Sequence, residues 1–89
     1  MKMLSIGFGN YVSPGHILSI VSPDSAPIKR LISECKDKGL LIDASFGRST
    51  KSVIIADNGN VILSSLTTDI LAARLVELEK TGGDLYGQG

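Results

Sequence analysis

The chain has 89 residues, balances nine Lys or Arg against nine Asp or Glu, and is 43% hydrophobic with no tryptophan. This length suits a single domain, and the aliphatic composition excludes a disordered chain. No apolar run approaches the ~18 residues of a membrane span and the first residues lack a signal peptide's apolar core, so we expect a cytoplasmic protein without a membrane partner. A single cysteine, Cys35, cannot form an internal disulfide, and within a helical pattern we expect it to be a buried apolar group.

The first half of the chain predicts two strands and a helix. The strands cover residues 3–12 and 16–22, which are rich in Ile, Leu and Val and are separated by a Ser-Pro-Gly turn. The helix covers residues 26–38, with Pro27 near its first position and Gly39 as its stop signal. Its apolar stripe consists of Ile28, Leu31, Ile32 and Cys35.

Three further strands follow, at residues 40–46, 52–56 and 61–65. The short turn 47–51 separates the first two, and Asn58-Gly59 is a strong hairpin signal between the last two. We therefore expect these three strands to form a meander, with the turn 47–51 at the tip of a hairpin.

A second amphipathic helix is expected over residues 70–80, and we expect residues 81–89, with four glycines, to be a disordered tail. The candidate N-caps are Thr67, Thr68 and Asp69, and the candidates for the inner face are Ile70, Ala73, Leu75 and Leu78. The fold class that results is α+β: one domain over residues 1–80, with about five short, mostly antiparallel strands and two helices in the order β-β-α-β-β-β-α.

Nothing in the sequence indicates an enzyme. The single histidine, His16, has no cysteine or acid near it in sequence, and one His with one Cys is too few for a structural zinc site. The segment "GFGN" lacks the third glycine of a dinucleotide fingerprint and predicts a tight bend instead, and "GRSTKS" lacks the Gly-Lys of a phosphate loop. We expect no catalytic residue, no metal and no small-molecule cofactor.

The charge distribution favours an anionic partner. Residues 1–55 carry seven Lys or Arg against four Asp or Glu, a net +3, whereas residues 56–89 carry two against five, a net −3. A chain polarised in this way can present a basic face while remaining neutral overall, although halves of this size also arise by chance in small domains.

Four residues of the turn 47–51 supply donors for phosphate oxygens: Arg48, Ser49, Thr50 and Lys51. Lys29 and Arg30 add two cations at the start of the first helix, as tentative DNA contacts that also suit solvated helix positions. Phe8 and Phe46 could stack on bases, but strand positions favour a place in the core.

The blocks "IGFGN", "SIVSPDSAPIKRLI", "GLLIDASFGRSTKSVI" and "VILSS" stand in the order and spacing of the RemA family of bacterial extracellular-matrix regulatory proteins, which this chain resembles over residues 4–75. The resemblance implies a cytoplasmic, nucleoid-associated transcriptional regulator that binds double-stranded DNA and activates biofilm-matrix genes. It also implies a protomer related to LytTR-type domains and a ring-like homo-oligomer around which DNA is thought to wrap.

The resemblance also implies roles for individual residues. Arg48, Thr50 and Lys51 match the family's DNA-contacting turn, whereas Ser49 and His16 stand where a basic residue is common, so both are DNA contacts of reduced charge. Pro27 matches a family proline and is assigned a structural role or an oligomer contact.

A second hypothesis remains open: a non-enzymatic, ring-forming assembly module that binds protein partners or a small anionic ligand. In that case Arg48 would pair with Asp43 or Asp57 of a neighbouring subunit.

Overall fold

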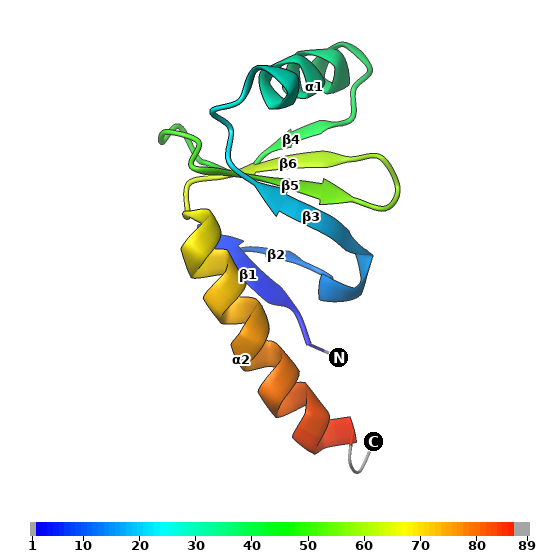
Figure 1. Ribbon diagram of the computed structural model, residues 1–89, viewed down its shortest axis with the longest axis vertical. Coiled ribbons are helices and arrows are strands. Elements are labelled where there is room, and N and C mark those ends of the chain that lie inside the picture. The colour runs from blue at the N-terminus through cyan, green and yellow to red at the C-terminus, as the bar shows by residue number, and fades with distance from the viewer. Residues whose placement is uncertain (1, 87–89) are drawn as a thin grey trace.

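A four-stranded sheet lies in the middle of the molecule, with a helix on one side and a hairpin and a long helix on the other (Figure 1). The structure, a computed structural model, describes the backbone of residues 2–86 and the side chains of residues 2–80. The elements are β1 (Leu4–Gly7), β2 (Asn10–Val12), β3 (Ile17–Val21), α1 (Ala26–Asp37), β4 (Leu41–Asp43), β5 (Ser52–Ala56), β6 (Val61–Ser64) and α2 (Thr68–Tyr86), with a 3-10 turn at Pro14–His16. The α+β class is therefore confirmed, with six strands in place of five.

The extra strand comes from residues 3–12, which the sequence predicts as one strand and which fold as the hairpin β1–β2. The bend is at "GFGN": Gly7, Phe8 and Gly9 have φ angles of 104°, 54° and 78°. Such left-handed angles reverse the chain within two residues, and the two flanking glycines allow them. The tight bend predicted for this segment is confirmed, but the uninterrupted strand is wrong.

The predicted meander is also wrong. The sheet order is β3-β5-β6-β4, and β4 pairs in parallel with β6, with Leu41 opposite Val61. Because β6 lies between β4 and β5, residues 44–51 do not form a hairpin tip but a crossing loop over the end of β6. Backbone hydrogen bonds hold both ends of this loop to β6, from Ala44 N to Leu63 O (2.9 Å) and from Lys51 N to Ser64 O (2.8 Å). The hairpin at Asn58-Gly59 is confirmed by the antiparallel pairing of β5 with β6.

Both faces of the sheet are covered, which the alternation of side chains along β5 and β6 makes plain. Val53, Val61 and Leu63 pack against the inner stripe of α1, where Cys35 is buried as predicted. Their neighbours Ile54 and Ile62 point to the other face. There they meet side chains of the β1–β2 hairpin and α2, chiefly Leu4, Ile6 and Leu71.

The two helices begin at side-chain caps, and that of the second is among the predicted candidates. Ser25 Oγ accepts a hydrogen bond from Ile28 N (3.4 Å) at the start of α1, and Thr67 Oγ1 accepts one from Ile70 N (3.2 Å) at the start of α2. These caps satisfy backbone N–H groups that have no partner within the helix.

The inner face of α2 confirms the prediction for Leu75 and Leu78 and differs from it at Ile70 and Ala73. Leu71 is fully buried and Leu75 and Leu78 pack beside it, whereas Ile70 and Ala73 are exposed. The positions 71, 75 and 78 follow the i, i+4, i+7 spacing of one helix face, and the buried strands decide which of the possible faces is used.

α2 continues to Tyr86, beyond the predicted end at residue 80, since no proline interrupts it. Of the tail predicted at 81–89, residues 87–89 lie outside the described residues, and its disorder stays a prediction. Neither helix, over the residues described, is long and apolar enough to cross a membrane.

Candidate nucleic-acid interface

The crossing loop is built on a carboxylate at the end of β4. The Asp43 carboxylate accepts hydrogen bonds from Ser45 Oγ and from Ser45 N (2.9 Å). These two bonds, the hydroxyl's first, hold the pKa of Asp43 below its ordinary value. They fix the first residues of the loop.

Residues 45–48 form a tight turn in which Arg48 N donates a hydrogen bond to Ser45 O (3.0 Å). Phe46 and Gly47, the central residues, have φ angles of 56° and 79°, which are typical of a type I′ turn. The turn directs the Phe46 ring away from the sheet, so that this side chain is 76% exposed.

The β1–β2 hairpin repeats this geometry with the same dipeptide. Gly7 pairs with Asn10 across the turn, Asn10 Nδ2 donates to Gly7 O (3.0 Å), and Phe8-Gly9 has φ angles of 54° and 78°. A second Phe-Gly pair therefore lies at the tip of a second turn of the same type.

The two turns meet through their aromatic rings. The rings of Phe8 and Phe46, the aromatic pair, stack with centroids 5.0 Å apart and planes inclined by 22°. The Arg48 guanidinium lies over the Phe8 ring, with Cζ 5.7 Å from its centroid, which is within cation–π range. The core positions that the sequence favours for these two phenylalanines are wrong. The signal for a turn at each place was the glycine after the Phe, since glycine suits the second left-handed position of such a turn.

A shallow groove of about 260 Å³, the cation groove, lies beside the aromatic pair. It is lined by Phe8, Arg48, Ser49, Lys51 and Ser65. Three of the four predicted turn residues therefore share one surface with an aromatic ring, while Thr50 is half-buried beside them. Ser65, just after β6, is the member that sequence reasoning missed, because only the crossing of β6 by the loop brings it there.

The cations of the groove are free to meet an external anion. Among the side chains that the structure describes, neither Arg48 nor Lys51 takes part in an ion pair. Ser64, the buried neighbour of Ser65, holds this part of the chain in place. Its Oγ donates a hydrogen bond to Ile6 O (2.8 Å) and accepts one from Leu66 N (3.1 Å). The groove can therefore offer two charges and two hydroxyls to phosphate oxygens at a position that the core holds in place.

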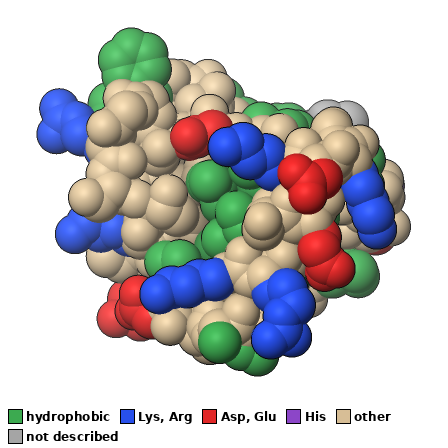
Figure 2. Space-filling model, turned by 90° about the horizontal axis from the view of Figure 1, so that it is seen from above, with side chains coloured by type: hydrophobic (Ala, Val, Ile, Leu, Met, Phe, Trp, Pro, Cys, Tyr) green, Lys and Arg blue, Asp and Glu red, His purple; other side chains and the backbone are tan. Residues whose placement is uncertain are grey.

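Lys29, Arg30 and Pro27 lie in the first turn of α1, at the same end of the sheet as the crossing loop (Figure 1). The end of β3 beside the start of β5, with Val21 opposite Val53, brings them to this end. All three are exposed, with Pro27 in the first two helical positions, as predicted, but none lines the cation groove. Seen from above, basic side chains at the left-hand edge, which is the side of the crossing loop in Figure 1, have no acidic side chain between them (Figure 2).

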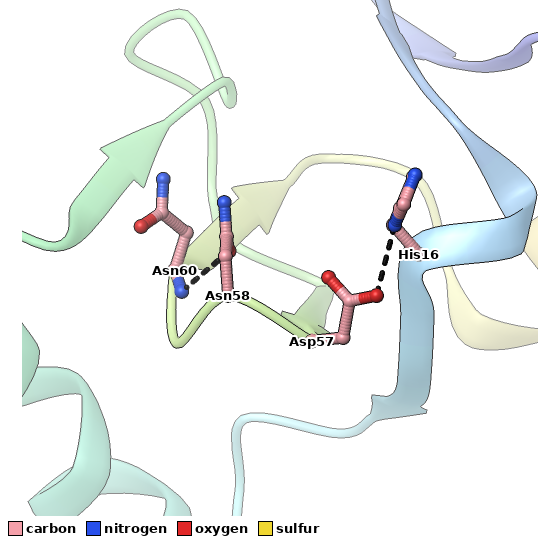
Figure 3. A network of polar contacts seen from close by, with 4 residues as sticks. All are labelled: His16, Asp57, Asn58 and Asn60. Atoms are coloured by element: carbon pink, nitrogen blue, oxygen red, sulfur yellow. Dashed lines mark hydrogen bonds and ion pairs between the residues drawn. The ribbon is translucent and has the colours of Figure 1, made fainter.

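His16 lies at the other end of the sheet. Its Nδ1 is 2.8 Å from Asp57 Oδ2, and Asp57 N donates to His16 O (2.8 Å), so that the pair joins the start of β3 to the β5–β6 turn (Figure 3). The five residues of β5 separate it from Lys51 by roughly 17 Å. The structure therefore does not bring His16 together with the turn residues.

Comparison with known proteins identifies the family of this chain. Residues 3–75 match the family model described as RemA-like, extracellular matrix regulatory protein A-like. The chain belongs to the RemA-like family. The matched range covers both Phe-Gly turns, the crossing loop and the cation groove, and it agrees with the resemblance found over residues 4–75.

Relatives of the RemA-like chain come from several bacteria, and the three that follow bear names that begin "Putative regulatory protein". One from Carboxydothermus hydrogenoformans is 59% identical over 75 residues, which are 84% of this chain and 86% of the relative. One from Desulforamulus reducens is 54% identical over 79 residues, 89% of this chain and 88% of the relative. One from Halalkalibacterium halodurans is 51% identical over 84 residues, 94% and 97% of the two chains. The family and these names indicate a regulatory protein and not an enzyme.

Proposed function

We propose that this protein is a transcriptional regulator that binds double-stranded DNA as a ring-like homo-oligomer, with Arg48 and Lys51 holding backbone phosphates. The observation that carries the proposal is the cation groove, where two cations with no ion-pair partner among the described side chains lie beside Ser49 and Ser65 on a loop fixed at both ends. Donors of this kind position DNA through its phosphates and read little sequence. Activation of extracellular-matrix genes and association with the nucleoid in the cytoplasm belong to the same proposal.

The distribution of charge supports DNA binding on the side of the molecule that carries the cation groove. α2 leads away from the sheet and carries its acidic residues with it (Figure 1). At about 1.5 Å per residue, Glu77 lies on the order of 13 Å along the helix from Thr68, and Glu79 lies further still. The face that would meet DNA is thereby separated from Glu77 and Glu79.

Assembly into a ring would multiply a small number of contacts. One groove supplies only two cations, but repeated grooves on one oligomer raise the effective concentration for each further contact. Both edge strands of the sheet carry an exposed aliphatic side chain, Leu18 on β3 (69% exposed) and Ile42 on β4 (46%). Exposed apolar groups on unpaired edges suit contacts between subunits.

The test is fluorescence anisotropy of a labelled AT-rich duplex of about 60 bp over a series of salt concentrations. Wild type, Arg48→Ala and Lys51→Ala are compared, with Lys36→Ala as the control because Lys36 is an exposed cation in the last turn of α1. Each lost phosphate contact should reduce the slope of log K against log[salt] by ~0.9, and the control should leave it unchanged. The absence of salt-dependent binding by wild type of verified oligomeric state would overturn the proposal.

The assembly module remains the second candidate, and the same variants separate the two. In that case Arg48 would bind Asp43 or Asp57 of a neighbour, but both carboxylates already have partners within the chain, Ser45 and His16. Loss of the oligomer in Arg48→Ala, measured by light scattering after size-exclusion chromatography, would favour the assembly module. An intact oligomer with weakened DNA binding would favour the regulator.

A further inference from the structure

The aromatic pair has no part in phosphate contacts, yet the fold holds both of its residues in an unusual backbone conformation. Phe8 and Phe46 both have positive φ angles, the only non-glycine residues to do so in the described part of the chain. A bulky residue in this region is a genuine outlier, and such conformations concentrate at functional sites. Both rings are also largely exposed, so burial in the core does not explain them.

We propose that Phe46, supported by Phe8, is a wedge that contacts bases in the DNA minor groove beside the phosphates held by Arg48 and Lys51. This inference rests on the proposed DNA binding and adds a residue that touches bases. It assigns different roles to the two rings: Phe46 contacts the DNA, and Phe8 positions both Phe46 and Arg48.

The placement of Phe46 suits a wedge. The ring is 76% exposed at the tip of a turn whose ends are fixed by the bond from Arg48 N to Ser45 O and by the pairing of the loop with β6. Minor-groove proteins insert apolar side chains of this kind between base steps and unstack them, at flexible steps above all. A rigid support keeps such a ring from folding back onto its own surface.

Phe8 supplies that support. It is 48% exposed, it stacks on Phe46, and the Arg48 guanidinium lies over its ring. The apolar wedge and the phosphate-binding cation are therefore held by one side chain, which would fix the distance between a contacted base step and its phosphate.

Charge favours DNA over a second copy of this chain as the partner. The aromatic pair borders a groove with two cations that have no ion-pair partner among the described side chains, and the nearest acid along the loop, Asp43, already binds Ser45. A subunit interface here would bury these cations at a high cost in desolvation unless the neighbour aligned its own carboxylates with them. Leu18 and Ile42, on the edge strands, suit subunit contacts without that cost.

The experiment uses the full-length oligomer and a duplex of about 60 bp with 2-aminopurine at 5′-TA steps, whose fluorescence rises when the base is unstacked. Wild type is compared with Phe46→Ala, Phe46→Leu and Phe46→Gly, the last because glycine adopts the required backbone angle freely. Val76→Ala, at an exposed apolar site on α2 outside the cation groove and the edge strands, is the matched control. Circular dichroism and light scattering establish fold and oligomeric state for each variant.

We expect wild type to raise the 2-aminopurine signal, and Phe46→Ala and Phe46→Gly to abolish that rise and weaken binding by about tenfold or more. Because the lost contact is apolar, their plots of log K against log[salt] should run parallel to that of wild type, whereas Arg48→Ala changes the slope. Phe46→Leu should retain most of the signal, and Val76→Ala should retain wild-type unstacking.

Three results would overturn the wedge without contradicting DNA binding by the wild-type oligomer: unchanged affinity and fluorescence in Phe46→Gly, loss of the oligomer in Phe46→Ala, or a change of slope equal to that of Arg48→Ala. The second result would make the pair a subunit contact, and the third would make it a support for the cation alone. Absence of DNA binding by the wild-type oligomer would overturn the proposed function, and the wedge with it.

Discussion

Phe8 and Phe46, which belong to different turns, stack with their ring centroids 5.0 Å apart, and each is followed by a glycine that completes the same left-handed turn. The stack joins the β1–β2 hairpin to the crossing loop at the surface, above the buried bond from Ser64 Oγ to Ile6 O. The stack holds the loop that carries Arg48 directly, and the buried bond holds β1 to β6, the strand to which both ends of that loop are hydrogen-bonded.

Because of its position in the Phe46-Gly47 turn, we predict that Gly47→Ala lowers the free energy of unfolding. Gly47 has a φ of 79° and open space where the added methyl group would lie, so the cost is that of the left-handed backbone, about 1–2 kcal/mol of unfolding free energy. Urea unfolding measures it. Gly15→Ala is the control, because Gly15 lies in equally open space without a positive φ and should change stability by less than about 0.5 kcal/mol. Equal losses in the two variants would contradict the assignment of the cost to the turn.

Ser52 and Ser64 face each other across β5 and β6, both fully buried, but they should respond oppositely to alanine. Ser64 Oγ donates a hydrogen bond to Ile6 O and accepts one from Leu66 N, so Ser64→Ala should lower the unfolding free energy by about 1–3 kcal/mol. Ser52 Oγ has no hydrogen-bond partner among the described residues, so Ser52→Ala should leave stability unchanged or raise it. Thermal unfolding of both variants tests the contrast, and a large loss in Ser52→Ala would reveal a partner for that hydroxyl.

We predict that Asp43 makes a pH-dependent contribution to the free energy of unfolding. The hydrogen bonds from Ser45 hold the pKa of Asp43 below its ordinary value, so the folded chain binds this proton less readily than the unfolded chain. The contribution is present above the unfolded pKa of about 3.9 and is lost as pH falls through the lower folded-state pKa. Asp43→Asn should therefore be less stable than wild type at neutral pH, with the difference shrinking below about pH 4. Urea unfolding at several pH values measures this, and Ser45→Ala should reduce the dependence because it removes the larger of the two causes.

Added charge at two predicted contacts tests where DNA passes. Ser49 lines the cation groove, so Ser49→Lys should strengthen DNA binding and increase the salt slope by up to ~0.9 for each added contact. His16 lies beyond the far end of β5 beside Asp57, so His16→Lys increases the slope only if the DNA path also covers that end. Anisotropy titrations of the two variants distinguish a contact confined to the groove from one that spans the sheet. A slope unchanged by Ser49→Lys would argue against phosphate in the groove.

Local patterns were enough to predict the elements whose boundaries are set by neighbouring residues. The helix predicted at 26–38 is observed at Ala26–Asp37, and the strand predicted at 52–56 is observed at Ser52–Ala56. Ser25, Gly39 and Asn58-Gly59 act on the backbone within a few residues, so their effect can be predicted without the fold. The strand predicted at 3–12 failed because its apolar pattern outweighed the "GFG" bend inside it.

Propensity, capping and turn chemistry act over short stretches of chain, which is why the α+β class, the two helices and a cluster of cations between two strands could be predicted before any fold was known. The position of β6 between β4 and β5 could not, since which strands pair depends on which faces can be buried together. That pairing turns a predicted hairpin tip into a crossing loop, brings Ser65 into the cation groove and stacks Phe46 on Phe8. Contacts between residues so distant in the chain leave no periodic signal, and the candidate interface forms only once both faces of the sheet are packed.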